Sequence, residues 1–247
     1  MQGKVALVTG GGRGIGAATC KLLASKGAKV VVNFAHNEEA ARAVVREISD
    51  TGGDATLIQA DVRDNAQVTS MMNSIVETWG TLDILVNNAN MSFAMKPISQ
   101  MSWDEFAQKL NDEMKAAFFM TKAVTPIMVA KHYGRIVYVA SGLARRPTRN
   151  MAAHGSAKAT LVQFARYVAE EFGSQGITAN VISPGLVLTE ATQFIPEENL
   201  KRTAAVTPLG HVATPLDVAQ AIAMYCDDGC QFITGTYVPV NGGMSMD

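Results

Sequence analysis

Short apolar segments rich in valine and isoleucine alternate along the chain with longer segments whose apolar residues recur every three or four positions. The short segments predict strands and the longer ones predict helices. The predicted strands are Val5–Thr9, Lys29–Asn33, Ala55–Gln59, Ile84–Asn87, Arg135–Ala140, Thr178–Ser183 and Tyr237–Val240. The predicted helices are Ile15–Lys26, Asn37–Thr51, Asn65–Trp79, Trp103–Val129, Gly155–Phe172 and Pro215–Cys226. Pro126 lies inside the fourth predicted helix, and we expect that helix to kink or end there.

This order of elements predicts an α/β protein. Apolar strands separated by helices form a parallel sheet that is covered by helices on both faces, as in a Rossmann fold. No low-complexity tract, internal repeat or Pro/Gly-rich linker divides the 247 residues. We therefore expect a single dinucleotide-binding domain over residues 1–247, built on a parallel seven-stranded sheet.

The composition is that of an ordinary folded globule, with 48% hydrophobic and 17% charged residues. The formal net charge of -1 provides no basic field, so we expect no nucleic-acid partner. No apolar run reaches the roughly 18 residues that a membrane span needs. The first predicted strand also begins too early to leave room for a signal peptide. We therefore expect no membrane partner.

The three cysteines, Cys20, Cys226 and Cys230, do not form a zinc-binding pattern, because Cys226 and Cys230 lack a second cysteine or histidine pair. We expect no metal site. Reduced, buried thiols are typical of the cytoplasm, and this is the location that we expect for the protein.

A glycine-rich turn connects the first predicted strand to the first predicted helix. Glycines allow a tight turn and a close approach of the backbone to a pyrophosphate, and the N-terminus of the following helix attracts the anion. A lone glycine motif is weak evidence, but one between a first strand and a first helix favours a dinucleotide site. The residues that we expect to bind the cofactor here are Gly10, Gly12, Arg13, Gly14, Ile15 and Gly16.

The residues after the second strand favour NADP(H) over NAD(H). An acidic residue at this place would bind the ribose 2′-hydroxyl of NAD. The chain instead has Asn33 and Phe34 there, which we expect beside the cofactor, and its next acid is Glu38. Arg13 in the glycine turn could bind a 2′-phosphate, to which a guanidinium is well suited. An ordinary surface charge is the alternative interpretation of Arg13.

Further motifs follow at regular places along the rest of the chain. They are Asp61-Val62, Asn87-Asn88-Ala89, Ser141, Lys158, Pro184-Gly185 with Thr189, and Ile233-Thr234-Gly235. Together with the glycine turn, they make the chain resemble the short-chain dehydrogenase/reductase family from end to end, closest to its beta-ketoacyl reductase branch. The resemblance implies cofactor contacts from Asp61, Val62, Asn88, Ala89, Lys158, Pro184, Gly185, Val187 and Thr189. It also implies a homotetramer paired through the helices Trp103–Val129 and Gly155–Phe172, and a substrate lid over about 190–208.

The family also implies a catalytic Ser, Tyr and Lys with the spacing Ser-x12-Tyr-x3-Lys, and an Asn on the preceding long helix. Ser141 and Lys158 match this pattern, whereas His154 stands where the family has Tyr. Glu113 aligns with the family's Asn, and Asn90 stands where a glycine is usual. His154 and Glu113 could form an acid/base pair that works near neutral pH, or His154 could simply fill the space of the Tyr.

We favour an NADP(H)-dependent oxidoreductase that acts on a carbonyl/alcohol pair of a small molecule, such as a 3-oxoacyl compound or a similar ketone. Its catalytic residues would be Ser141, His154, Lys158 and Glu113. Two alternatives remain open. One is an isomerase or lyase without net redox chemistry that uses His154 and Glu113 for proton transfer. The other is a catalytically silent dinucleotide-binding protein.

Overall fold

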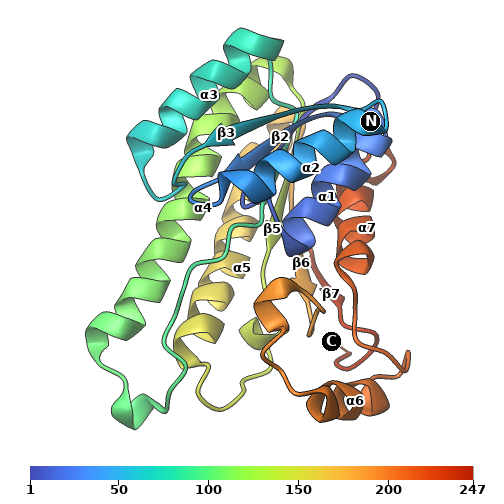
Figure 1. Ribbon diagram of the computed structural model, residues 1–247. Helices are drawn as coiled ribbons and strands as arrows, with labels where there is room; N and C mark the ends of the chain where they lie inside the picture. The colour runs from blue at the N-terminus through green and yellow to red at the C-terminus, as the bar shows by residue number, and fades with distance from the viewer. Residues whose placement is uncertain (247) are drawn as a thin grey trace.

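The computed structural model describes residues 1–246 of the chain. Seven parallel strands form one sheet in the order β3-β2-β1-β4-β5-β6-β7. The strands are β1 Val5–Val8, β2 Lys29–Phe34, β3 Asp54–Gln59, β4 Ile84–Asn87, β5 Gly134–Val139, β6 Ile177–Pro184 and β7 Tyr237–Val240. This arrangement confirms the predicted Rossmann-type α/β fold (Figure 1).

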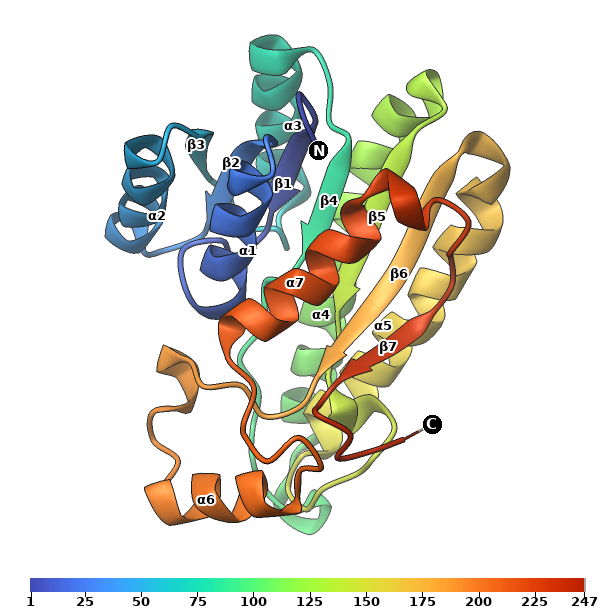
Figure 2. The ribbon, with the colours of Figure 1, turned by 90° about the vertical axis from the view of Figure 1, so that its right-hand side faces the viewer.

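Helices cover both faces of the sheet. The α-helices are α1 Gly14–Ser25, α2 Glu38–Asp50, α3 Asn65–Trp79, α4 Trp103–Lys131, α5 Ala152–Phe172, α6 Glu197–Val206 and α7 Pro215–Cys226. One apolar core joins α3, α4 and α5 to the sheet, and a second joins α1, α2 and α7 to the opposite face. Figure 2 shows α1 and α7 in front of the sheet, with α4 and α5 behind it. The short 3-10 helices are η1 Ile98–Gln100, η2 Gly142–Ala144, η3 Gly173–Gln175, η4 Glu190–Thr192 and η5 Asp228–Cys230.

The predicted elements all occur, with two differences that matter. Helix α4 continues past Pro126 to Lys131, so of the two expected outcomes, a kink or an end, the end is wrong. Val124 and Met128 are fully buried on either side of Pro126, and their packing outweighs the one lost backbone hydrogen bond. Helix α5 begins at Ala152, three residues before the predicted start at Gly155. His154 therefore lies in the first turn of α5.

The direction in which strands are added to the sheet reverses at β1. Strands β2 and β3 extend the sheet on one side of β1, and β4 begins the other side. In open parallel sheets, ligands bind at the carboxyl ends of the strands beside such a reversal. Helix α6, within the predicted lid, lies beyond the carboxyl ends of β6 and β7 (Figure 2). Across residues 1–246, we find no helix that is both long and apolar enough to cross a membrane.

Candidate functional site

The glycine-rich turn leads from β1 into α1 and leaves the N-terminus of that helix open. Gly14 starts the helix with a φ of 52°. A Cβ on Gly16 would lie only 2.3 Å from the carbonyl oxygen of Gly10, so the turn can close this tightly only with glycine. Exposed Arg13 precedes the helix, and within the described residues no side chain caps it. The free N–H groups at this end fit a pyrophosphate.

Thr9 and Asn88 lock the turns after β1 and β4 together. The hydroxyl of Thr9 accepts hydrogen bonds from the backbone N–H groups of Asn88 at 2.9 Å and Ala89 at 3.0 Å. The side-chain amide of Asn88 donates to the Thr9 carbonyl oxygen at 2.9 Å. Asn88 and Ala89 thus lie against the glycine turn, where the sequence placed them. The sequence analysis did not single out Thr9, whose hydroxyl joins these two turns.

Asn33 and Phe34 are both buried, at 2% and 6% exposure. The side-chain oxygen of Asn33 accepts from the backbone N–H of Gly10 at 3.4 Å, and its amide donates to the Ala60 carbonyl oxygen at 3.0 Å. Asn33 therefore positions the glycine turn and the end of β3 from within the protein. Its side-chain hydrogen bonds are directed to the protein backbone.

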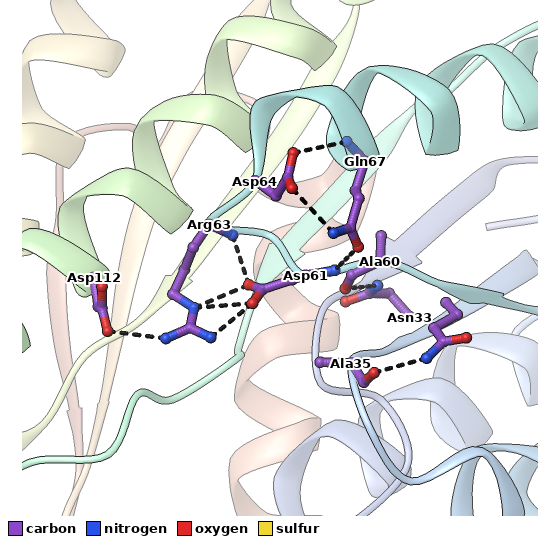
Figure 3. Close-up of polar contacts among 9 residues, drawn as sticks. Asn33, Ala35, Ala60, Asp61, Arg63, Asp64, Gln67 and Asp112 are labelled. Carbon is purple, nitrogen blue, oxygen red and sulfur yellow. Dashed lines mark hydrogen bonds and ion pairs between the residues drawn. The ribbon is translucent and has the colours of Figure 1, made fainter.

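Asp61 follows β3 in a network of polar contacts (Figure 3). Arg63 binds its carboxylate at 2.6 Å and also reaches Asp112 on α4 at 2.9 Å. The hydrogen bond from Arg63 lowers the pKa of Asp61. Gln67 accepts from the backbone N–H of Asp61 at 2.8 Å, and Val62 is buried beside it. The carboxylate of Asp61 is thus charged and fixed at the edge of the site.

The segment after β6 returns to the glycine turn. Gly185 donates from its backbone N–H to Val240 at 3.0 Å, directly after Pro184. Val187 is buried, and Thr189 begins η4. A Cβ on Gly14 would lie 3.3 Å from the Cγ2 atom of Thr189. The start of the predicted lid therefore packs against the N-terminus of α1.

Two lysines share one carboxylate in the interior, at the other side of the site. Glu113 on α4 receives a hydrogen bond from Lys158 of α5 at 2.6 Å on one oxygen and from Lys109 at 2.6 Å on the other. The side chains of all three residues are at most 4% exposed. Burial raises the pKa of Glu113, but the two ammonium groups outweigh burial, and the net result is a lowered pKa. The carboxylate is therefore ionised, and the cluster has a net positive charge.

His154 lies against this cluster but does not join it. Its ring stacks on Phe93 with centroids 4.5 Å apart, and its Nδ1 atom is buried without a hydrogen-bond partner among the described residues. Burial lowers the pKa of His154 to about 4, Lys158 and Lys109 act in the same direction, and Glu113 opposes them. The first turn of a helix also disfavours a cation. The imidazole is therefore neutral near pH 7.

Among the described residues no hydrogen bond joins His154 to Glu113, whose two carboxylate oxygens each bind a lysine. Ser141 lies two residues after β5, and its hydroxyl accepts from the backbone N–H of Leu143 at 3.3 Å. Lys158 also donates to the Val139 carbonyl oxygen at 2.8 Å. Ser141 and Lys158 therefore both lie at the carboxyl end of β5.

Comparison with known proteins agrees with this geometry. A family model described as enoyl-(acyl carrier protein) reductase matches residues 10–245. The chain belongs to the short-chain dehydrogenase/reductase family. It is similar to versicolorin reductase of Emericella nidulans, with 36% identity over 98% of this chain and 96% of the relative. It is also similar to the 3-oxoacyl-(acyl-carrier-protein) reductase of Escherichia coli, with 35% identity over 99% and 98% of the two chains.

A reductase of the same printed name from Staphylococcus aureus is 34% identical over 98% of each chain. Membership of the short-chain dehydrogenase/reductase family makes the chain an oxidoreductase that uses a nicotinamide dinucleotide. Among the described residues, His, Cys, Asp and Glu form no group of three or more that could hold a metal ion.

Sequence reasoning missed Lys109 and Phe93, which lie beside Glu113 and His154. Lys109 precedes Glu113 by one helical turn, and this i,i+4 spacing was the only signal that the sequence offered. Such a lysine is more often solvent-exposed. Phe93 lies in the irregular segment after β4, where no periodic pattern places a side chain.

Proposed function

We propose that the chain is an NADP(H)-dependent oxidoreductase that interconverts a ketone and a secondary alcohol, with His154 and Glu113 in place of the family's Tyr and Asn. The convergence of chemical groups at the carboxyl ends of β1, β4 and β5 carries this proposal. Thr9, Asn87 and Glu113 line one small cavity there. Lys158 links Glu113 to the end of β5. The glycine turn that fits a pyrophosphate begins directly after Thr9.

The dinucleotide would lie along the carboxyl ends of the strands. Gly10, Gly12, Gly14, Ile15 and Gly16 would hold the pyrophosphate, and Asp61 and Val62 would hold the adenine. Asn88, Ala89 and Lys158 would contact the nicotinamide ribose, and Pro184, Gly185, Val187 and Thr189 would contact the nicotinamide. The bound cofactor would supply the hydride for reduction or accept it in the reverse direction. Arg13 supports NADP(H), because its exposed guanidinium could pair with a 2′-phosphate.

His154 would donate a hydrogen bond to the carbonyl oxygen of the substrate as a neutral imidazole, and the alkoxide formed by hydride transfer would take its proton from water. Its buried Nδ1 atom lacks a partner among the described residues. Buried N–H groups without a partner are rarer than buried acceptors without one. The ring proton therefore belongs on Nε2, which leaves that N–H for the substrate. A neutral imidazole can polarise a carbonyl in this way, and Ser141 would orient the same carbonyl.

The substrate would be an apolar ketone. Large exposed side chains flank the lid, including Leu188 at 43%, Phe194 at 72% and Leu209 at 68% exposure. Such side chains near a site favour an apolar ligand. The similar proteins are named as reductases of versicolorin and of 3-oxoacyl groups, which supports a 3-oxoacyl compound or a similar ketone. We also propose a cytoplasmic homotetramer paired through α4 and α5.

The test is the loss of NADPH absorbance over a panel of 3-oxoacyl thioesters and aromatic ketones. We expect turnover with at least one ketone, and a loss of roughly 10² to 10³ in His154→Ala, which is the usual contribution of one hydrogen-bond donor to a developing oxyanion. His132→Asn is the matched control, because His132 is exposed at the end of α4. NADPH binding without oxidation by any ketone would favour the silent dinucleotide-binding protein.

A further inference from the structure

Lys109 is a fully buried ammonium whose three protons all have acceptors. It is 0% exposed, and its Nζ atom donates to Glu113 at 2.6 Å, to the Asn90 side chain at 3.0 Å and to the Met91 carbonyl oxygen at 2.9 Å. A buried ammonium is costly unless it is paired and hydrogen-bonded. These contacts satisfy it completely and fix its position between α4 and the segment after β4.

The same ammonium determines what Glu113 can contact. Lys109 and Lys158 each take one of the two carboxylate oxygens of Glu113. Without Lys109, the Glu113 oxygen that it binds would remain buried but would lose its ionic partner. That oxygen would then be available to another donor beside it. The present arrangement therefore keeps Glu113 directed at Lys158.

Lys109 is also connected to His154 through an aromatic ring. Its Nζ atom lies 5.5 Å from the centre of the Phe93 ring, within the range of a cation–π contact. The ring of Phe93 stacks on His154. The hydrogen bonds of Lys109 to Asn90 and Met91 hold the backbone just before Phe93. One side chain thus supports both Glu113 and the stack on which His154 rests.

We propose that Lys109 is a positioning residue of the proposed reductase site, which directs Glu113 to Lys158 and leaves His154 as a neutral hydrogen-bond donor. This inference rests on the proposed function. It adds a role for a residue that touches neither the proposed cofactor path nor the proposed substrate.

The charges that act on His154 make the proposal measurable. Lys158 acts from α5, and Lys109 and Glu113 act from α4. Together they have a net charge of about one positive unit at neutral pH. Removing the charge of Lys109 should raise the pKa of His154, because like charges disfavour the imidazolium ion. Removing the charge of Glu113 should lower this pKa instead.

The experiment is an NMR titration of the histidine ring protons in the full chain. The chain has four histidines, and His154→Gln assigns the signal of interest. We expect the pKa of His154 to rise in Lys109→Met and to fall in Glu113→Gln. Lys115→Met is the matched control, because Lys115 is exposed on the same helix, and it should leave the titration unchanged.

The double variant Lys109→Met/Glu113→Gln covers the case in which a single variant does not fold. It removes one positive and one negative charge, so its net charge equals that of the native cluster, and the pKa of His154 should return to near the native value. The proposal is overturned if Lys109→Met leaves the titration unchanged, or if Lys109→Met and Glu113→Gln shift it in the same direction. Failure of the proposed function would be visible separately, as a native protein that oxidises no NADPH.

Discussion

His154 should make the protein lose stability as the pH falls from neutral. Its ordinary pKa of 6.5 is lowered to about 4 in the folded state, by burial first and then by Lys158 and Lys109. The unfolded chain therefore binds this proton more readily than the folded protein does. The corresponding stability is fully present above about pH 6.5 and is lost as the pH falls toward 4.

The size of this effect follows from the two pKa values. One unit corresponds to about 1.4 kcal/mol, so the full effect is about 3 kcal/mol. Integration over a single site gives about 2 kcal/mol of lost unfolding free energy between pH 7.5 and pH 5. This is a large part of the roughly 5 to 15 kcal/mol that stabilises a typical protein.

Urea unfolding at a series of pH values, without cofactor, measures this loss. His154→Gln removes the titrating group and keeps a polar side chain of similar length. Between pH 7.5 and pH 5, the native protein should lose about 2 kcal/mol more than this variant. Acidic side chains contribute to both proteins alike, so their contribution cancels in the difference.

His132→Asn is the control for the same experiment. His132 is exposed and ends α4 in a left-handed conformation, which asparagine also adopts. This variant should follow the pH dependence of the native protein. If His154→Gln and the native protein lose the same unfolding free energy over this range, His154 is not held neutral by its surroundings, and the electrostatic description of the site is wrong.

Three further predictions concern the cofactor and the assembly. Gly16→Ala should weaken NADPH binding at least tenfold in a fluorescence titration, because the new Cβ atom would lie 2.3 Å from the Gly10 carbonyl oxygen. Gly173→Ala is the control and should have no effect, because the space around Gly173 is open. Arg13→Ala should weaken NADPH binding by roughly 10-fold to 100-fold, the value of a charged hydrogen bond, and leave NADH binding unchanged; equal losses for both cofactors would contradict the role of Arg13. Phe118→Asp should convert the tetramer into smaller species in light scattering, because Phe118 is 48% exposed on α4; a native monomer would refute the assembly.

The strands and most helices could be predicted because their signals are local. β-branched runs and helical spacing depend on neighbouring residues, and every predicted strand lies within two residues of the observed one at either end. The early start of α5 could not be predicted in this way. Met151 precedes that helix without capping it, so no capping residue marks the boundary.

The candidate site was less predictable, because its electrostatics depend on contacts between distant elements. Glu113 and Lys158 are 45 positions apart in the chain but hydrogen-bond directly. From the sequence alone, Lys109 would be predicted to lie on the surface. In the folded chain it hydrogen-bonds to Asn90 and Met91. The sequence therefore predicts candidate residues for the site, but their hydrogen-bond partners depend on the fold.

The most direct test of the account is the transfer of deuterium from NADPH in which both hydrogens at the nicotinamide C4 position are deuterium. Mass spectrometry of the product measures it, after incubation of the protein with the ketone that is consumed fastest. We predict one deuterium atom at the new alcohol carbon, with transfer strongly reduced in His154→Ala and unchanged in His132→Asn. Protein that binds NADPH but transfers no deuterium to any ketone would contradict the proposed oxidoreductase.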